Sequence, residues 1–252
     1  MSSGLTALVT GAGRGIGAAA AARLSQAGHR VALTARSADQ LETAARACPG
    51  ETMTIPADLT ADGAVDEIFD AAQERFGPVE ILVLNAGAAD SAPLPRISDE
   101  AWAAQLELNL TAPFRCLRRA TPSMKQRGWG RVVAVASAAS KHGEPYIAAY
   151  TAAKHGLLGL VRSAAAELAG AGVTVNAVCP GYVDTPMTDA SVAAIAEYTG
   201  KSLEAARRRL EDKQPIGRLI TADEVADAIM FCVTTGGVTG QGINVDGGAV
   251  QS

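Results

Sequence analysis

TGAGRGIG, residues 10–17, joins a short apolar run, Leu5–Thr10, to an Ala-rich segment of helical length, Ile16–Ala27. Glycine permits positive φ angles and close backbone approach. A helix that begins in such a turn offers free N–H groups and the positive end of its dipole to an anion, so this order of elements is typical of a site for the pyrophosphate of a dinucleotide. The residues expected to contact it are Gly11, Gly15, Ile16 and Gly17. An ordinary tight turn is the alternative, because the spacing differs slightly from GxGxxG.

The rest of the chain alternates between strand-length and helix-length segments. Strands are expected at Leu5–Thr10, Arg30–Ala35, Thr52–Pro56, Ile81–Leu84, Val132–Ala136, Val173–Val178 and Gly242–Val245. Helices are expected at Ile16–Ala27, Ala38–Ala47, Asp62–Phe76, Asp99–Arg119, Ala148–Ala169 and Ala222–Cys232. Thr60, Ser98 and Thr221 suit helix N-caps, and Glu224 completes a capping box with Thr221.

This alternation predicts the fold. Strands separated by crossover helices cannot form hairpins, so they pair in parallel with right-handed connections, and the helices cover both faces of the sheet. We predict an α/β fold, a doubly wound Rossmann-type parallel sheet of seven strands, as a single domain over residues 1–252. The polar, helix-prone segment 187–214 breaks the rhythm. It is expected to form a helical lid over the substrate site, or to be a solvated helical excursion.

Composition and charge exclude several classes of function. The 252 residues are 48% hydrophobic and 19% charged, as in a globular protein, and the net charge of −4 provides no basic field for nucleic acid. No segment approaches the roughly 18–20 continuous apolar residues of a membrane span, and no basic leader precedes the first strand, so a cytoplasmic location is expected. The four cysteines and three histidines show no metal-ligand or disulfide spacing, so neither a metal nor a disulfide is expected.

The end of the second predicted strand distinguishes NADP from NAD. A carboxylate there would accept the ribose hydroxyls, whereas a 2′-phosphate would be repelled by it and bound by arginine. The sequence has Arg36 at this point and no acid, and Arg14 projects from the glycine turn. We therefore expect NADPH as the preferred cofactor. NAD remains possible if both arginines are ordinary surface residues.

Tyr150 and Lys154 are four residues apart in a predicted helix, so they share one face. A free phenol has a pKa near 10, and a neighbouring ammonium would lower that pKa and make the tyrosine a usable general acid. Ser137 follows the fifth strand, at the edge where doubly wound sheets bind ligands, and its hydroxyl can polarise a carbonyl oxygen. For the Tyr/Lys pair taken alone, a solvated helix face is the alternative.

Several separated motifs resemble the short-chain dehydrogenase/reductase family over essentially the whole chain. They are TGxxxGxG at Thr10–Gly17, Asp58-Leu59, Asn85-Ala86-Gly87, Asn109, Ser137, YxxxK at Tyr150–Lys154, Asn176, and Pro180-Gly181 followed by Thr185. The resemblance implies a catalytic tetrad. In it Tyr150 donates the proton and Ser137 orients the carbonyl. Lys154 grips the nicotinamide ribose and lowers the tyrosine pKa, and Asn109 holds a water for proton relay.

The same resemblance implies contacts to the cofactor. Asp58 would contact adenine, Asn85 would lie near the ribose, and the segment from Pro180 through Gly181 to Thr185 would hold the nicotinamide. The remaining expected contacts are Leu59, Ala86, Gly87 and Val183, beside Tyr150 and Lys154 themselves. The family also suggests a homotetramer, in which the predicted helices Asp99–Arg119 and Ala148–Ala169 pack across interfaces.

Within the family the sequence is most similar to 3-oxoacyl and polyketide ketoreductases. The similar segments are Asn176–Val183, Thr185–Met187, Pro215–Arg218 and Asn244–Gly248. We therefore expect NADPH-dependent reduction of a ketone, either a 3-oxoacyl thioester or a related ketone. Ala171 stands where carrier-dependent reductases tend to have a basic residue, so a CoA thioester and a free ketone stay open beside a carrier-bound substrate. The alternatives are an NAD-dependent alcohol or 3-hydroxyacyl-CoA dehydrogenase and a catalytically silent dinucleotide-binding sensor or scaffold.

Other polar and aromatic residues have weaker functional signals. His142 and Tyr146 lie between Ser137 and Tyr150 and either line the substrate pocket or fill the loop. Trp102 and Trp129 are expected to be packing residues.

Overall fold

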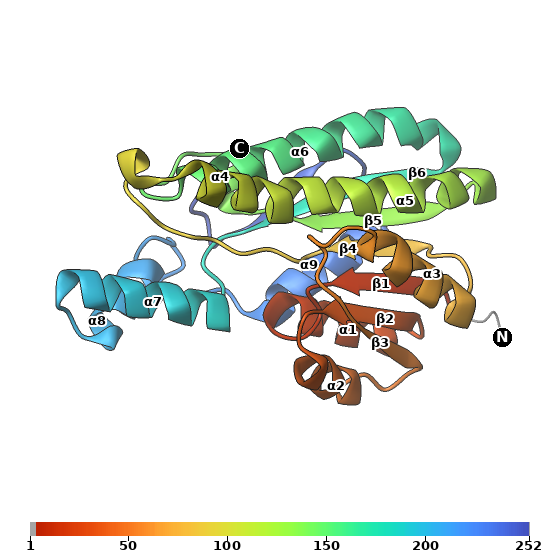
Figure 1. The fold of residues 1–252 in the computed structure, drawn as a ribbon, viewed down its shortest axis with the longest axis horizontal. Coiled ribbons are helices and arrows are strands. Elements are labelled where there is room, and N and C mark those ends of the chain that lie inside the picture. Colours follow the sequence, from red (N-terminus) through yellow and green to blue (C-terminus); the bar gives the residue numbers. More distant parts are fainter. Residues whose placement is uncertain (1–3, 252) are drawn as a thin grey trace.

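Seven strands form one parallel sheet in the order β3-β2-β1-β4-β5-β6-β7, in a computed structural model that describes residues 4–251 (Figure 1). The strands are β1 (Thr6–Thr10), β2 (Arg30–Ala35), β3 (Thr52–Pro56), β4 (Ile81–Leu84), β5 (Gly130–Val135), β6 (Val173–Pro180) and β7 (Gly242–Val245). The order and the parallel pairing confirm the predicted doubly wound sheet. The observed limits of each strand differ from the predicted ones by two residues or fewer.

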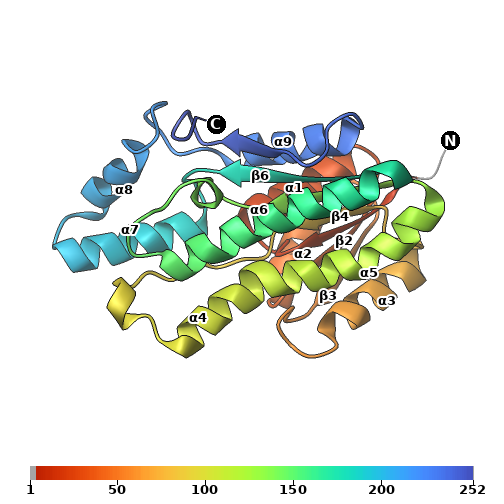
Figure 2. The ribbon, with the colours of Figure 1, turned by 90° about the horizontal axis from the view of Figure 1, so that it is seen from above.

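Helices cover both faces of the sheet (Figure 2). They are α1 (Gly15–Gln26), α2 (Ala38–Arg46), α3 (Ala64–Phe76), α4 (Asp99–Leu106), α5 (Ala112–Arg127), α6 (Ala148–Leu168), α7 (Pro186–Thr199), α8 (Leu203–Glu211) and α9 (Ala222–Thr234). Successive residues of a strand point to opposite faces. Leu8 therefore packs in the core under α3, α5 and α6, while its neighbours Ala7 and Val9 pack in the core under α1, α2 and α9. Burial on both sides explains why the strands are apolar throughout.

The predicted helix Asp99–Arg119 is part of a longer rod. Helix α4 continues through a π-helical turn, Glu107–Thr111, into α5, which ends only where Gly128 adopts a left-handed φ of 66°. The rod also contains Pro122 in its interior. The π-helical turn contains one residue more than an α-helical turn would need. This extra residue sets the orientation of Asn109, described below.

The helix caps follow the prediction at two sites and differ at a third. Ser98 caps α4, and Thr221 forms the predicted capping box with Glu224 at α9. Thr60 does not cap a helix: its N–H and hydroxyl donate to Asp58 Oδ1, at 2.9 and 2.7 Å. Thr60 therefore forms a local turn with the carboxylate two residues earlier. The prediction for Thr60 was wrong, and α3 starts later, after Gly63.

Helices α7 and α8 lie together beyond the carboxyl edge of the sheet (Figure 1). They make up most of the segment 187–214 that was predicted to be a lid, and Val192 of α7 and Leu210 of α8 pack with Leu219 in a small separate core. Arg207 of α8 pairs with Asp184, 2.9 Å away, in the loop that follows β6. This ion pair connects the two helices to the edge of the sheet where ligands bind in such folds.

All four cysteines are buried and unpaired. Within residues 4–251, no cluster of His, Cys, Asp or Glu side chains could hold a metal ion. Trp129 packs partly buried against the core under α1, as predicted. The prediction for Trp102 was wrong, because 41% of this residue is exposed on α4. No helix within residues 4–251 has the length and apolarity to cross a membrane.

Candidate active site

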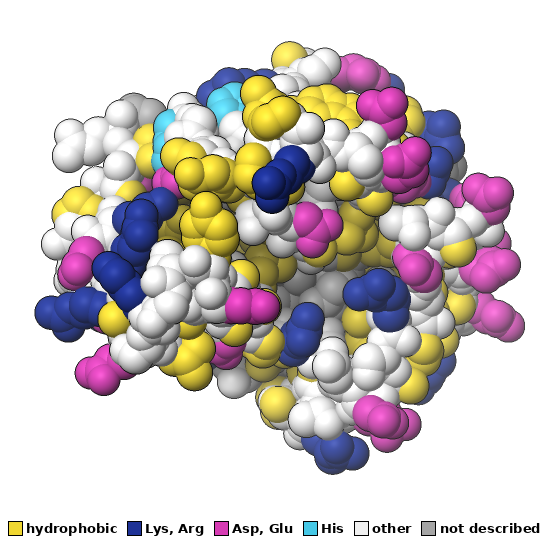
Figure 3. All heavy atoms as spheres, turned by 60° about the vertical axis from the view of Figure 1, so that its left-hand side comes forward, with side chains coloured by type: hydrophobic (Ala, Val, Ile, Leu, Met, Phe, Trp, Pro, Cys, Tyr) yellow, Lys and Arg dark blue, Asp and Glu magenta, His cyan; other side chains and the backbone are white. Residues whose placement is uncertain are grey.

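Ser137, Tyr150 and Lys154 lie close together at the carboxyl edge of the sheet. Ser137 starts a short 3-10 helix just after β5, and this helix packs against α6, which carries Tyr150 and Lys154 one turn apart. The face that contains this edge is hollowed near its centre, with hydrophobic side chains around the hollow (Figure 3). A doubly wound sheet binds its ligands at this edge.

Lys154 is a buried ammonium group. Only 3% of the residue is exposed, and its Nζ donates to the carbonyl of Val135 at 3.0 Å and lies 5.5 Å from the centre of the Tyr150 ring. Burial lowers the pKa of Lys154 to about 8. The amine therefore still carries its proton at neutral pH, but it releases that proton far more readily than a surface lysine does.

Tyr150 lies beside Ser137. Burial raises the pKa of the Tyr150 phenol, and a hydrogen bond with Ser137 opposes that rise. The expected lowering of this pKa by Lys154 is not seen, because desolvation is the largest effect and raises the pKa. The Ser137 hydroxyl oxygen accepts from the N–H of Ala139 at 3.1 Å. Its proton is therefore free to point toward Tyr150 or a substrate oxygen.

Asn109 is fully buried in the π-helical turn. Its Nδ2 donates to the carbonyl of Ala88 at 2.9 Å and to the backbone and side-chain oxygens of Gln105 at 3.1 and 3.2 Å. Its Oδ1 has no hydrogen-bond partner among the described residues. A Cβ on Gly87 would lie 2.8 Å from this oxygen and 3.5 Å from Lys154 Nζ, so the unpaired acceptor faces the same small space as the lysine. A water there would satisfy the orphaned oxygen.

Asn85 and Thr10 hold the glycine turn in place. Asn85 Nδ2 donates to the carbonyls of Thr10 and Gly11, at 3.0 Å each. The hydroxyl of Thr10 accepts from the N–H groups of Asn85 and Ala86, at 2.9 and 3.1 Å. A Cβ on Gly17 would lie 2.3 Å from the Gly11 carbonyl oxygen, so only glycine fits. The Asn85 side chain thus supports the turn itself.

The loop after β6 lies against the glycine turn. The Thr185 methyl group would lie 3.1 Å from a Cβ on Gly15, which has a left-handed φ of 56°, so the two loops meet. Gly181 donates its N–H to the Val245 carbonyl at 3.1 Å, and Val183 is buried. The loop therefore runs directly from Pro180 at the end of β6 to the start of α7 beside the glycine turn.

The charged residues expected at the adenosine end lie around the ends of β2 and β3. Asp58 is exposed, and the Thr60 N–H and hydroxyl hydrogen bonds lower its pKa, with a smaller contribution from the charge of Arg36. Leu59 beside it is buried. Arg14 and Arg36 are both exposed. The structure thus brings Arg36 into electrostatic range of Asp58 and leaves both guanidinium groups accessible.

These residues fit a nicotinamide dinucleotide. Gly11 and Gly17 have no room for a Cβ, and the turn leads into the uncapped N-terminus of α1, as a pyrophosphate requires. The orphaned Asn109 Oδ1 and the buried Lys154 ammonium supply an acceptor and a donor on one side of the carboxyl edge. The expected contacts therefore extend along this edge from Asp58 to Thr185.

Sequence reasoning missed several polar side chains that support this edge. Gln105, only 4% exposed, links Asn109 to Asp90. Gln214, only 1% exposed, bonds to the backbone of Tyr182. No motif signals them, because each acts through contacts that only the folded chain creates.

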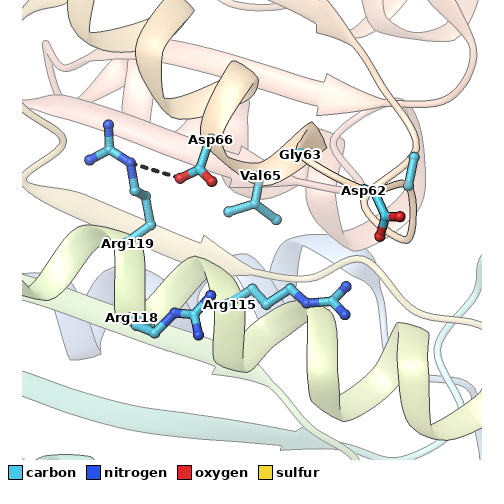
Figure 4. Close-up of a pocket in the computed structure, with 8 residues that line it drawn as sticks. Asp62, Gly63, Val65, Asp66, Arg115, Arg118 and Arg119 are labelled. Carbon is cyan, nitrogen blue, oxygen red and sulfur yellow. Dashed lines mark ion pairs between the residues drawn. The ribbon is translucent and has the colours of Figure 1, made fainter.

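A pocket of about 280 Å³ lies elsewhere, between the start of α3 and the side of α5 (Figure 4). Arg115, Arg118 and Arg119 line it opposite Asp62 and Asp66, and Arg119 pairs with Asp66 at 3.2 Å. None of the residues lining it is an expected site residue. Arg115 pairs instead with Glu107, which does not line the pocket.

Comparison with known proteins agrees with this geometry. The sequence model described as short chain dehydrogenase matches residues 5–196. The chain is 37% identical to a D-beta-hydroxybutyrate dehydrogenase of Cupriavidus necator, covering 99% of both chains, and 38% identical to the 3-oxoacyl-[acyl-carrier-protein] reductase MabA of Mycobacterium avium, covering 96% of this chain and 88% of that protein. A crystal structure of an actinorhodin polyketide ketoreductase variant with NADPH superimposes with a TM-score of 0.94 at 37% identity, covering 98% of this chain and 97% of that one. The chain therefore belongs to the short-chain dehydrogenase family and is an NAD(P)-dependent oxidoreductase.

Proposed function

We propose that the protein is an NADPH-dependent carbonyl reductase that acts on a 3-oxoacyl thioester or a related ketone. The observation that carries this proposal is the Tyr150 phenol, hydrogen-bonded to Ser137 and one helical turn from the buried Lys154. The nicotinamide cofactor, when bound, supplies the hydride. The ketoreductases among the relatives support a carbonyl substrate.

The protein side chains would supply the proton and orient the substrate and the cofactor. Ser137 would donate its free hydroxyl proton to the substrate oxygen and hold it beside Tyr150. Tyr150 would protonate that oxygen, and its raised pKa keeps the phenol protonated until then. Lys154 would bind the ribose hydroxyls and return a proton to the phenol through a water held by Asn109 Oδ1.

Substitution of Tyr150 tests the assignment. Tyr150→Phe removes only the hydroxyl, so we expect turnover of a 3-oxoacyl thioester to fall by about 10²–10⁴, the range for general acid catalysis, while NADPH binding remains measurable. Thr43→Val removes an exposed hydroxyl of α2, outside every expected contact, and as the control it should keep full turnover. Unchanged turnover in Tyr150→Phe would refute the assignment.

The preference for NADPH is supported by Arg14 and Arg36, which are exposed beside the glycine turn and at the end of β2. Arg36→Asp removes a cation and adds an anion where a 2′-phosphate would lie, so affinity for NADPH should fall by at least tenfold while affinity for NADH should not. Equal losses for both cofactors would contradict this preference.

A second candidate is an NAD-dependent hydroxyacid or alcohol dehydrogenase. The relative named D-beta-hydroxybutyrate dehydrogenase favours it, at an identity similar to that of the ketoreductases. Steady-state rates in both directions, with NADH/NAD and NADPH/NADP, decide between the two candidates. A silent dinucleotide-binding protein would bind a cofactor and turn over neither substrate.

Three further expectations complete the proposal: 187–214 acts as a substrate lid, the chain forms a homotetramer, and the protein is cytoplasmic. The ion pair between Arg207 of α8 and Asp184 supports a lid role, because it would make α8 move together with the loop after β6. Sedimentation in solution tests the tetramer. Cell fractionation tests the location.

A further inference from the structure

Tyr182 is held unusually firmly for a residue in a loop. Its N–H donates to Gln214 Oε1 at 2.8 Å, and its carbonyl accepts from Gln214 Nε2 at 3.2 Å and from the N–H of Ile220 at 2.9 Å. Its ring packs against the small core of α7 and α8. Because Gln214 is almost fully buried and bonds to both sides of this residue, the position of the Tyr182 side chain is fixed before any ligand binds.

The hydroxyl of Tyr182 accepts a hydrogen bond from a charged donor. Lys213 Nζ lies 3.3 Å from this hydroxyl and 2.8 Å from Glu144 Oε2. Burial lowers the pKa of Lys213, but the hydrogen bond to Glu144 and the nearby Tyr182 raise it by more, so the group stays an ammonium. An ammonium can only donate, so the phenol oxygen is the acceptor and its own proton points elsewhere. Donation from a cation also makes that phenol a stronger hydrogen-bond donor.

Tyr182 belongs to a loop that starts at the same edge of the sheet as the Ser137 loop. Tyr182 follows β6 and Ser137 follows β5, and these strands are neighbours with Val135 paired to Val178, so the two loops start side by side. Glu144, which holds Lys213, belongs to the loop between Ser137 and Tyr150. Tyr182 also interacts electrostatically with Tyr150 and contributes to its raised pKa, so the two phenols lie in the same region of the edge.

This inference rests on the proposed reductase function. We infer that Tyr182, oriented by Lys213, is a second hydrogen-bond donor of the substrate site and that it binds the thioester or ester carbonyl of a 3-oxoacyl substrate. In such a substrate two carbonyl oxygens lie on carbons separated by a single carbon. Ser137 and Tyr150 would take the oxygen that is reduced, and Tyr182 would take the other. A substrate with one ketone leaves this donor unmatched, so the site selects 1,3-dicarbonyl compounds.

Tyr182→Phe tests the inference, because it removes the hydroxyl and leaves the ring packed against the small core of α7 and α8. The two substrates are the acetoacetyl thioester of N-acetylcysteamine and cyclohexanone. We expect the ratio of kcat/KM for the thioester to kcat/KM for cyclohexanone to fall by about 10–100-fold, as for a lost hydrogen bond with a partner strengthened by charge. Lys213→Met should lower the same ratio by less, and the control Thr43→Val, which removes an exposed hydroxyl of α2, should leave it unchanged. An unchanged ratio in Tyr182→Phe would overturn the inference.

A binding measurement separates this inference from the proposed function. If the wild-type protein reduces neither substrate with either cofactor, the reductase proposal fails, and affinity for the thioester then decides the role of Tyr182. Titration calorimetry compares Tyr150→Phe with Tyr150→Phe/Tyr182→Phe, both in the presence of NADP⁺, which has no hydride to transfer, so that no turnover interferes. A tenfold or greater loss of thioester affinity in the double variant supports the second donor. Equal affinities overturn it.

Discussion

Replacing Lys154 by methionine should make the ligand-free protein more stable at neutral pH while it impairs the reductase activity. Lys154 is 3% exposed, and burial lowers its pKa from 10.5 to about 8. Each pKa unit corresponds to about 1.4 kcal/mol, so keeping this ammonium charged in the folded protein costs about 3 kcal/mol at pH 7. Methionine has a similar length and no charge. It forfeits the 3.0 Å hydrogen bond to the Val135 carbonyl, worth about 1 kcal/mol.

The net gain expected for Lys154→Met is therefore about 2 kcal/mol in the free energy of unfolding at pH 7, or about 4–8 °C in Tm for a chain of this size. The gain depends on pH. Between pH 8 and pH 10.5 the folded wild-type protein has lost this proton while the unfolded chain keeps it, so wild-type stability rises with pH in that window. By about pH 9.5 the wild type recovers about 2 kcal/mol, and the advantage of the variant disappears.

Urea unfolding of both proteins at pH 7 and pH 9.5 measures this difference. Lys201→Met, an exposed lysine between α7 and α8, is the matched control and should change stability by less than about 0.5 kcal/mol at either pH. A Lys154→Met protein that is less stable than wild type at pH 7, or that keeps the same advantage at both pH values, would refute the burial argument.

Three other substitutions have expected outcomes. Thr10→Val removes the acceptor of the Asn85 and Ala86 N–H groups and should lower the free energy of unfolding by about 2–4 kcal/mol in urea. Gly181→Ala would place a Cβ 2.2 Å from the buried Gln214 Oε1, so a loss of about 1–3 kcal/mol is expected in the same assay, together with lower kcat. Glu224→Ala removes a helix cap whose pKa is lowered to about 2, chiefly by its hydrogen bond with an arginine, and should cost about 1 kcal/mol at pH 7 because the site is partly exposed. That last difference should shrink as the pH falls from 4.5 toward 2, because the carboxylate then gains its proton in the unfolded chain first.

The sequence predicts the sheet well because strand and helix periodicity are local properties. Its errors occur where two local preferences compete. Thr60 has the residue type of an N-cap, but Asp58 captures its N–H and hydroxyl first. Trp102 has the residue type of a core residue, but its helix presents it to the surface.

The candidate site is predictable only in part for a similar reason. Motifs identify Tyr150 and Lys154, and their spacing brings both into one region. The spacing of the two residues shows that Lys154 is near the phenol, but it does not show that both groups are removed from water. The sequence therefore predicted a lowered Tyr150 pKa, whereas burial raises it. The Glu144–Lys213–Tyr182 group joins residues up to 69 positions apart, and no pattern along the chain marks it.

The π-helical turn within the rod of α4 and α5 changes which side of the helix faces the rest of the protein before and after the turn. A residue advances an α-helix by about 100°, so an extra residue rotates everything that follows it relative to everything before. Within the turn, Asn109 faces the space beside Lys154, and downstream of it Cys116, Leu117 and Met124 point into the core. Deleting one residue from Glu107–Thr111 would restore regular helix but leave only one of these two alignments intact. The number of residues in the rod is therefore constrained both by the position of Asn109 beside Lys154 and by the packing of α5 in the core.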